Sequence, residues 1–342
     1  MKSTKTVRNV TIRDVAKQAG VGVGTVSRVL NDHASVSPDM RAHILSVMSE
    51  LRFRPDSIAQ DLNRKYTKCL GVVVPDLINP FFAELVQALG QAARQENYNL
   101  FLANSSEDPT LEAESIDSLC RRRIDGLFLI AAQAGLGNYQ NFNVPIIHVD
   151  HLPDGSRGVS ADHAGGVGLA VRYLNGLGHR KIALLAGART SLPATLRRDS
   201  YIRAMAPTLA ELGLPIDDYI VTGHFDLGSG EVGLRQLMSL PDGKRPTAII
   251  ASSDLQAIGA LHAAHGLGLA VPRDVSLIGF DGLTISGMIT PRITTIEQPV
   301  DDIAKTAFSL FREVRDQASE RRQVLLDCRL RPGETCTAPP DE

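Results

Sequence analysis

Apolar residues near the start of the chain recur with the spacing of a short amphipathic helix. Four of them fall at i, i+3, i+4 and i+7 and so share one helix face: Ile12, Val15, Ala16 and Ala19. Thr11 is a typical N-cap, and Asp14 stands at N3 beside the positive end of the helix. Gly20 follows at a position where helices commonly end in the left-handed conformation. Residues 11–20 are therefore predicted to form a helix that ends in a turn.

The same spacing returns after a two-residue turn, Val21-Gly22, in the stretch VGTVSRVLN. Its apolar positions again share one helix face: Val23, Val26, Val29 and Leu30. Two short helices joined by a turn that contains glycine are typical of a helix-turn-helix. A third helix is predicted to begin at Pro38, after the N-cap Ser37, and to stop before Pro55. The apolar face of this third helix is Ile44, Leu45, Val47, Met48 and Leu51.

From Cys69 onward, apolar runs of strand length alternate with amphipathic helical stretches. The runs that read as strands are residues 70–74, 99–103, 126–131, 145–150, 181–186, 247–252 and 276–281. The helices between them are expected to start near Pro80, Thr110, His163, Leu196, Gly228, Asp254 and Asp301. Continuous apolar strands with helical crossovers indicate parallel sheets covered on both faces. Seven or more such units over this length predict two α/β lobes.

Charge is distributed unevenly along the 342 residues. Residues 1–68 carry twelve Lys and Arg against six Asp and Glu, a balance of +6, so the net charge of −2 leaves −8 on the remainder. A basic head on an acidic body is a signal of nucleic-acid binding. Four scattered cysteines without metal spacing predict reduced thiols in a cytoplasmic protein. No apolar stretch is long enough to span a membrane, and the charged N-terminus does not read as a secretory signal.

Motifs of catalysis are missing from the sequence. GxxxxGK[ST], GxSxG and HExxH do not occur, and the GVGVG at residues 20–24 lies in the helix-turn-helix, not after an apolar strand. His148, His151 and His163 fall near the expected cleft without triad or metal spacing. The chain is therefore predicted to be no enzyme, with no cofactor and no metal site.

A helix-turn-helix places the first residues of its second helix against base edges in the major groove. Arg28 can donate two hydrogen bonds to guanine, whereas Thr25, Ser27 and Asn31 suit phosphate oxygens. Arg41 could also reach the DNA backbone. From spacing alone, a small three-helix packing module with a solvated Arg28 stays open as the alternative.

The sequence resembles the lactose-repressor (LacI/GalR) family of bacterial regulators. TIRDVAKQAGVGVGTVSRVLN and VSPDMRAHILSVMSELRFRPDSIAQDL are similar to the family's N-terminal signature. LINPFFAEL, IDGLFLI, GHRKIALLAG, DLQAIGAL, VPRDVSLIGFD and ITTIEQP then follow in family order over residues 71–332. The resemblance implies an α/β, two-lobed periplasmic-binding-protein-like sensor with two Rossmann-like parallel-sheet subdomains, preceded by a small all-α helix-turn-helix domain. It implies a ligand-responsive repressor that binds a palindromic operator as a homodimer.

The resemblance also implies which residues contact the operator: Thr11, Val23, Gly24, Thr25, Ser27, Arg28, Asn31, Ser35, Arg41, Ala59 and Leu62. Residues 56–64 match the family's hinge helix, which folds on the operator and inserts a leucine, here Leu62, into the minor groove. A helix of about two turns is marginal alone, which fits coupled folding. Gly22 stands where most members have serine, and Gly24 offers no side chain to a base. Reading of the outer operator positions is therefore expected to depend on Arg28 and Val23.

Ligands of open parallel sheets bind beyond the carboxyl ends of the strands. Asp150, Asp254 and Asp281 stand at such ends, where a carboxylate can accept hydrogen bonds from vicinal hydroxyls. The resemblance implies the following effector-contacting positions: Asn79, Phe81, Phe82, Asp150, Arg197, Phe225, Ser253 and Asp281. Ser253 departs from the family's usual asparagine, so hydrogen bonding to the ligand must differ there. The combination favours a sugar or sugar derivative as effector, with a purine or other metabolite as the alternative.

The domain boundaries predicted from these features place the helix-turn-helix headpiece at 1–55 and the hinge helix at 56–66. The N-terminal sensor subdomain takes 67–160 and 299–327, the C-terminal one 161–298 and 328–332, and the polar, Pro-rich residues 333–342 form a disordered tail. The alternative function is a non-catalytic sugar-binding protein of the transport type, which shares the two-lobed fold. It would need an export signal and no DNA-binding head. Because no leucine heptads are found near the C-terminus, the expected state is a dimer.

Overall fold

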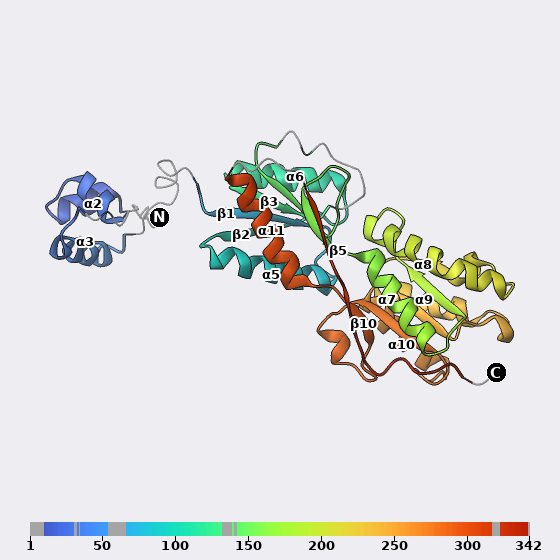
Figure 1. The fold of residues 1–342 in the computed structure, drawn as a ribbon. Coiled ribbons are helices and arrows are strands. Elements are labelled where there is room, and N and C mark those ends of the chain that lie inside the picture. Colours follow the sequence, from blue (N-terminus) through green and yellow to red (C-terminus); the bar gives the residue numbers. More distant parts are fainter. Residues whose placement is uncertain are drawn as a thin grey trace, which may run out of the picture. The chain divides into compact units, whose positions relative to one another are not determined.

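The computed structural model describes residues 10–30, 33, 35–53, 66–131, 139, 142–316 and 322–340. The chain forms two compact units, Met1–Thr67 and Lys68–Glu342, which are treated separately below (Figure 1). Of the predicted hinge helix at 56–66, all but Tyr66 lies outside the described residues. Within the described residues, no helix is long and apolar enough to cross a membrane.

The first unit packs three helices around one small core: α1 (Ile12–Gln18), α2 (Val23–Leu30) and α3 (Pro38–Glu50). Val15, Val26 and Ile44, one from each helix, are completely buried at its centre. The predicted starts of α1 and α3 are confirmed, since Thr11 and Ser37 cap them. Gly20 has φ +66°, the left-handed conformation expected of it.

The predicted third helix differs from α3 at one end and on one face. The helix stops at Glu50, earlier than Pro55 would require, and Arg52 at φ 49° turns the chain away. Leu45, which was assigned to the apolar face, is 51 % exposed. The core of three short helices is too small to cover every apolar residue that the spacing selects.

The second unit contains two six-stranded sheets, and the first has the order β11-β5-β4-β3-β1-β2. Its strands are β1 (Cys69–Val74), β2 (Asn99–Asn104), β3 (Gly126–Leu129), β4 (Ile146–Val149), β5 (Gly158–Ala161) and β11 (Gln323–Leu326). All five neighbouring pairs are parallel. Three helices cover this sheet: α5 (Pro80–Gln95), α6 (Pro109–Arg121) and α11 (Val300–Arg315).

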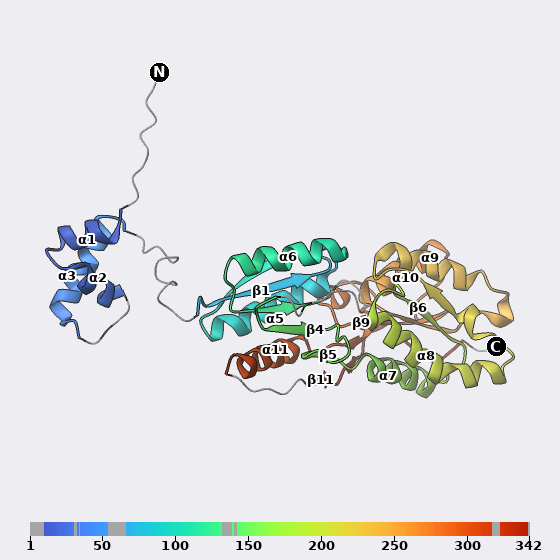
Figure 2. The same ribbon diagram turned by 90° about the horizontal axis from the view of Figure 1, so that it is seen from above.

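Alternation along β1 explains why helices lie on both faces of this sheet. Val72 belongs to the apolar cluster that includes α5 and α11, whereas the adjacent Val73 belongs to the cluster that includes α6. Both residues are completely buried. Seen from above, α6 lies on one side of the strands and α11 on the other (Figure 2). The predicted parallel sheet with two covered faces is confirmed.

The second sheet has the order β12-β10-β9-β8-β6-β7, with β12 antiparallel to β10 and the other pairs parallel. Its strands are β6 (Ile182–Ala186), β7 (Ile220–Thr222), β8 (Ala248–Ala251), β9 (Ser276–Asp281), β10 (Thr294–Glu297) and β12 (Arg329–Arg331). The helices beside it are α7 (His163–Gly176), α8 (Leu192–Glu211), α9 (Leu227–Met238) and α10 (Asp254–Gly266). Short 3-10 turns lie at η2 (Ile216–Tyr219), η3 (Asp242–Lys244) and η4 (Ile285–Gly287).

The chain passes between the two sheets three times, as the red and green segments of Figure 1 show. It leaves the first sheet after β5, returns from β10 to α11, and crosses again between β11 and β12. These crossings place the ends of several strands from both sheets at one boundary. That boundary holds the polar residues described below.

Residues 333–340 do not form the disordered tail that their composition predicts. Thr335 is completely buried; its hydroxyl donates to the Leu277 carbonyl at 2.6 Å and accepts from the Thr294 amide at 2.9 Å. Thr337 is also held, because its carbonyl lies 2.8 Å from His179 Nε2. The prediction of disorder is wrong for these residues, since specific hydrogen bonds to β9 and β10 hold the segment and Cys336 packs against the core. Residues 341–342 lie outside the described part.

Candidate functional site

Helix α2 presents its first residues to solvent. Val26 and Val29 anchor it in the core, which leaves Val23, Gly24 and Arg28 exposed on the opposite side. An apolar residue that is 43 % exposed, as Val23 is, suits a thymine methyl, and Arg28 is free of the core to reach a base edge. Thr25 and Ser27 are half-buried on the same helix. The structure therefore places these predicted base-reading residues on one exposed face of α2, from Val23 at its start to Arg28 in its last turn.

Other predicted DNA contacts have partners within the first unit. Thr11 forms a capping box with Asp14, in which the Thr11 amide and hydroxyl both donate to Asp14 Oδ2, at 2.8 Å and 2.7 Å. The guanidinium of Arg41 donates to the His33 carbonyl at 3.0 Å, so it also ties α3 to the loop after α2. Ser35 is exposed in that loop. The predicted contacts Asn31, Ala59 and Leu62 lie outside the described residues.

The fold does not demand glycine at either unusual position of the helix-turn-helix. A Cβ added to Gly22 or Gly24 would meet no heavy atom within 4 Å. Glycine within a helix is about 1 kcal/mol less favourable than alanine. Packing within the protein therefore does not explain the helix stability that is lost by having glycine at position 24.

In the second unit, a cavity of about 560 Å³ lies between the two sheets. It is bounded by the carboxyl ends of β1, β4 and β9, by the start of α5, and by α8. Seven of the eight predicted effector residues line it: Asn79, Phe81, Phe82, Asp150, Arg197, Phe225 and Asp281. The arrangement is the one expected for ligands of open α/β sheets.

Two carboxylates of this cavity sit on unusual backbone. Asp150 has φ +64° and Asp281 has φ +118°, a region that costs a residue with a side chain about 1–3 kcal/mol. Asp150 follows β4 and Asp281 ends β9, so each directs its carboxylate from a strand end. Strain concentrated at facing strand ends is typical of a site whose geometry is held by its surroundings.

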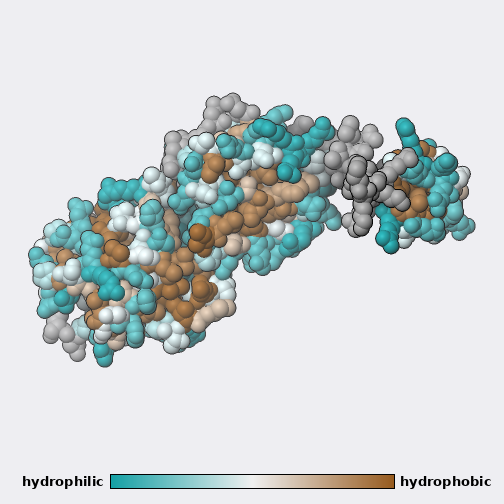
Figure 3. All heavy atoms as spheres, turned by 180° about the vertical axis from the view of Figure 1, so that it is seen from behind, coloured by the Kyte–Doolittle hydropathy of each residue, from teal (hydrophilic) through white to brown (hydrophobic). Residues whose placement is uncertain are grey.

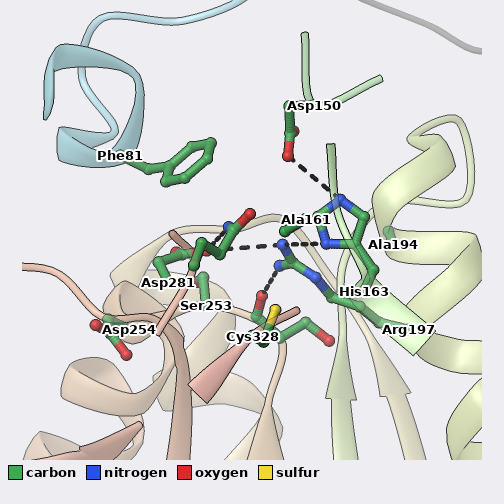
Figure 4. Close-up of polar contacts among 12 residues, drawn as sticks. Phe81, Asp150, Ala161, His163, Ala194, Arg197, Ser253, Asp254, Asp281 and Cys328 are labelled. Carbon is green, nitrogen blue, oxygen red and sulfur yellow. Dashed lines mark hydrogen bonds and ion pairs between the residues drawn. The ribbon is translucent and has the colours of Figure 1, made fainter. Parts of the chain in front are cut away.

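Arg197 of α8 is the polar centre of the site, as Figure 4 shows. It is 3 % exposed, one amino group donates to the Ser252 carbonyl, and the other lies 3.7 Å from Asp281 Oδ1. The guanidinium carbon also stands 3.8 Å from the Phe280 ring centroid, a cation–π distance. Because its charge is compensated on several sides, the guanidinium is fixed in position.

His163, the first residue of α7, joins Arg197 to Asp150 (Figure 4). Its Nδ1 lies 3.2 Å from Arg197 Nη2, and its Nε2 lies 3.2 Å from Asp150 Oδ1. A guanidinium has no acceptor, so Nδ1 must accept and the ring proton must lie on Nε2. Nε2 also lies 3.1 Å from Ser160 Oγ, so its proton is shared between this hydroxyl and the neighbouring Asp150 carboxylate. Residues from both sheets are thereby joined in one buried network.

The pKa values of the two strand-end carboxyl groups are shifted in opposite directions. Burial works against the charged form of Asp150, but the hydrogen bond of His163 and the Arg197 guanidinium outweigh it, so the pKa of Asp150 lies below its usual value. Burial raises the pKa of Asp281 well above its usual value, although Arg197 opposes the rise. Gln298 donates to Asp281 Oδ1 at 2.9 Å and holds this carboxyl in place. The carboxyl group of Asp150 is therefore the more acidic of the two.

Ser253 and Asp254 are not among the residues that line the cavity, and the contact of Ser253 with the effector stays a prediction. Ser253 is the N-cap of α10, and its hydroxyl accepts from the Gln256 amide at 3.1 Å. Asp254 accepts from the Leu283 amide at 2.7 Å and from the Thr295 hydroxyl at 2.5 Å. A polar residue at the start of a helix satisfies free amides there, and sequence alone could not separate that use from ligand binding.

Two histidines near Asp150 have roles that the sequence analysis did not assign. His163 stands in the network described above, and His151 lines the cavity. Their proximity to a strand-end aspartate in the sequence was the available signal, but neither has a recognisable spacing. Among the described residues, no group of three or more His, Cys, Asp or Glu side chains could hold a metal ion.

Comparison with known proteins adds to this geometry. The model of "Bacterial regulatory proteins, lacI family" matches residues 11–56, and that of a periplasmic binding protein-like domain matches residues 171–336. The chain is 32 % identical to catabolite control protein A of Priestia megaterium over 309 residues, covering 89 % of this chain and 92 % of that protein. It is 33 % identical to the ribose operon repressor of Escherichia coli K12 over 308 residues, covering 88 % and 92 %. Relatives named as a control protein and a repressor support the prediction that the chain is no enzyme.

Solved structures share the fold of this chain. The Lac repressor dimer bound to operator and the anti-inducer ONPF matches with a TM-score of 0.85 and 27 % identity, covering 97 % of this chain and all of that one. A LacI family regulator from Enterococcus faecium with bound ribose matches with a TM-score of 0.67 and 25 % identity, covering 79 % and 99 %. The predicted fold class, a helix-turn-helix head with a two-lobed sensor, is confirmed. The chain belongs to the LacI family of bacterial regulatory proteins.

Proposed function

We propose that the chain is a cytoplasmic, dimeric transcription regulator that binds a palindromic operator and is controlled by a small-molecule effector, a sugar or sugar derivative. The observation that carries this proposal is the presence, in one chain, of an exposed recognition helix and a cavity with convergent polar groups. A transport-type binding protein would need the cavity but not the exposed recognition helix. The match of residues 11–56 to the regulator family therefore speaks against that alternative.

Operator binding is assigned to the first unit. Arg28 and Val23 on the exposed face of α2 would read bases, and the smaller polar residues of α2 would position the helix on phosphates. The proposed set comprises Thr11, Val23, Gly24, Thr25, Ser27, Arg28, Asn31, Ser35, Arg41, Ala59 and Leu62. The related Lac repressor is seen bound to its operator as a dimer, which supports two such heads per operator.

Effector binding is assigned to the cavity between the two sheets. Phe81 is buried at its edge and Phe225 packs against Arg197, so apolar ring faces stand beside carboxylates, as a sugar ring requires. The proposed set is Asn79, Phe81, Phe82, Asp150, Arg197, Phe225 and Asp281. A related regulator that holds ribose and a relative named as the ribose operon repressor support a sugar.

Coupling between effector and operator would act through the buried network. Asp150 lies on the first sheet, whereas His163 and Arg197 lie on helices beside the second. A ligand that contacts both sides favours one relative placement of the two subdomains over another. Ligand and operator then affect each other's binding equally, by about 1–3 kcal/mol in typical cases.

Dimer formation is supported by the surface of the second unit. Figure 3 shows a band of hydrophobic residues along one face. Exposed apolar side chains in this unit include Phe101 and Leu102 on the edge strand β2, Val232 of α9, and Met288. Analytical ultracentrifugation at micromolar concentration is expected to give a dimer, and a tetramer or monomer would contradict this part of the proposal.

The regulator function is tested by gel retardation with palindromic sites from the chain's own promoter region. The purified protein is expected to retard such a site, and a bound effector is expected to change the affinity. Arg28→Ala should lower that affinity by about 1–3 kcal/mol, because a bidentate base contact is lost. A protein that retards no such site, with and without candidate effectors, is not the proposed regulator.

A further inference from the structure

The chain turns sharply directly after Asp281, one of the carboxyl groups of the effector cavity. Asp281 has φ +118° and Gly282 has φ +79°, so two consecutive residues have a positive φ, which a residue with a side chain rarely adopts. Position 282 requires glycine, because a Cβ there would lie 2.6 Å from Glu297 Cγ. The residues that follow, 282–286, are called the β9 loop below. The direction of the Asp281 carboxyl group therefore depends on how firmly this loop is held.

Arg331 of β12 holds the β9 loop by its backbone. Its Nη1 donates to the Gly282 carbonyl at 2.9 Å, and its Nη2 donates to the Leu283 carbonyl at 2.8 Å and to Ser286 Oγ at 2.7 Å. The Ser286 hydroxyl in turn donates to the Leu283 carbonyl at 2.6 Å. A planar guanidinium can span two neighbouring carbonyls in this way, whereas a lysine ammonium is a single point charge. Arg331 thus fixes the two residues that come directly after Asp281.

Arg331 is not among the described residues that line the effector cavity. It lines a second cavity, of about 600 Å³, and Asp281 lines both. Asp281 therefore belongs to the wall between the two cavities, with Arg197 on the effector side (Figure 4) and the β9 loop on the other. Any influence of Arg331 on a bound effector must pass through the β9 loop and Asp281.

The β9 loop also receives contacts that depend on the first sheet. β12 begins after the chain has crossed from β11, and antiparallel pairing places Arg331 opposite Thr295 of β10. The Thr284 amide of the loop donates to Glu84 Oε1 at 3.1 Å, and Glu84 belongs to α5 beside the first sheet. The loop is therefore held from two sides, and Arg331 supplies the contacts nearest to Asp281.

We propose that Arg331 is a positioning residue for effector binding, which holds the β9 loop so that the Asp281 carboxyl group faces the effector. This inference rests on the effector function proposed above and adds a residue outside the predicted site. Without Arg331, the Gly282 and Leu283 carbonyls lose their donor, the backbone of Asp281 relaxes, and its carboxyl group turns away from the ligand. A residue that only supports the fold would change stability but not the affinity of the folded molecules.

Hydrogen exchange of the full chain, followed by mass spectrometry, tests the effect on the loop. Arg331→Met keeps a side chain of similar length without donors, so the amides of residues 283–286 are expected to exchange at least about tenfold faster than in wild type. Exchange in α9 is expected to stay unchanged. Wild-type exchange in the β9 loop of this variant would overturn the inference.

Arg245→Met is the matched control. Arg245 also donates to a backbone carbonyl, that of Leu240 at 2.9 Å, and pairs with Asp242 at 2.7 Å. It precedes β8, at the end of the sheet opposite to the effector cavity. Exchange in the β9 loop should therefore be the same in Arg245→Met and in wild type, and an equal acceleration in both variants would overturn the inference.

Calorimetry with D-ribose, D-glucose, D-galactose and cellobiose then measures binding to wild type and variants. With the sugar that wild type binds most tightly, Arg331→Met is expected to lower affinity at least about tenfold. Arg331→Lys keeps the charge on one nitrogen and should lower affinity about threefold, whereas Arg245→Met should change it less than about twofold. Wild-type affinity in Arg331→Met, whatever its urea midpoint, overturns the inference. If Arg331→Met does not fold, wild-type affinity in Arg331→Lys overturns it.

The same titrations separate this inference from the proposed effector function. If none of the four sugars binds wild type at about 10 mM, ten times a millimolar Kd, the proposed sugar effector fails and this inference falls with it. If a sugar binds wild type and Arg331→Met equally well, the inference alone fails. Operator retardation by each variant checks that the protein used in the titrations is active.

Discussion

Replacing Asp254 with asparagine is expected to stabilise the protein at neutral pH. Asp254 is completely buried, and its two oxygens accept from the Leu283 amide and the Thr295 hydroxyl. An asparagine of the same shape can accept from the amide and donate to the Thr295 oxygen, so Asp254→Asn keeps both contacts. What it removes is the negative charge.

The size of the effect follows from the pKa. Burial raises the pKa of Asp254 from 3.8 to about 6, although hydrogen bonds from Thr295 and Leu283 oppose the rise. The folded state then holds its proton more tightly than the unfolded state, so stability falls as pH rises from about 4 to 6. Two pKa units correspond to a loss of about 3 kcal/mol, which is complete above pH 6. Asp254→Asn is expected to show no such loss.

The assay is urea unfolding of wild type and Asp254→Asn at pH 4.5 and pH 8. The variant should exceed wild type by up to about 3 kcal/mol at pH 8, and the difference should shrink at pH 4.5. Asp274→Asn is the control with opposite sign, because a hydrogen bond from Arg273 lowers the pKa of this half-buried carboxyl to about 2. It should lower stability at pH 8. A variant Asp254→Asn that is less stable than wild type at pH 8 would refute the reasoning.

Three further predictions concern other parts of the chain. Gly24→Ala should raise the stability of α2 by about 1 kcal/mol, seen as slower amide exchange in that helix, because the added Cβ meets no neighbour; faster exchange would contradict it. Arg197→Ala should abolish the effector's influence on operator affinity in gel retardation while basal operator binding remains; loss of both would indicate unfolding. Thr335→Val should lower the free energy of unfolding by about 1–3 kcal/mol, seen as a lower urea midpoint, because the Leu277 carbonyl and Thr294 amide lose a buried partner. An unchanged midpoint would show that the C-terminal segment adds nothing to stability.

Sequence patterns predicted the long elements because periodicity identifies elements with many apolar positions. β1 and β9 are buried along nearly their whole length, and their boundaries differ from prediction by at most one residue. Strand β7 (Ile220–Thr222) was missed, because three half-exposed or exposed residues give no apolar run. Helix α8 begins at Leu192, four residues before the predicted Leu196, since the cap Ser191 and Pro193 lie in a polar stretch. Whether a short element forms depends on contacts with neighbouring elements of the fold, and a local sequence pattern does not contain those contacts.

The candidate site was predictable to a similar extent and for a similar reason. Phe81, Arg197 and Asp281 could be assigned through the family resemblance, because their positions match a known pattern. His163 could not, since its role depends on being between Asp150 and Arg197 in space. Ser253 occupies a position that the family pattern assigns to the effector, but its hydroxyl accepts a hydrogen bond from the backbone of α10. Polar roles depend on which partners remain unpaired, and that requires coordinates.

The repeated crossing between the two sheets has a consequence for biosynthesis. The first sheet needs β11 at residues 323–326, and the second needs the hydrogen bonds of Thr335 and Thr337. Neither sheet can therefore be completed on the ribosome until nearly the entire chain has emerged, whereas the three-helix head is synthesised within the first 53 residues. A nascent or prematurely terminated chain would carry a finished recognition helix beside an unfinished sensor. Quality control of such truncated chains then becomes part of keeping the operator under ligand control.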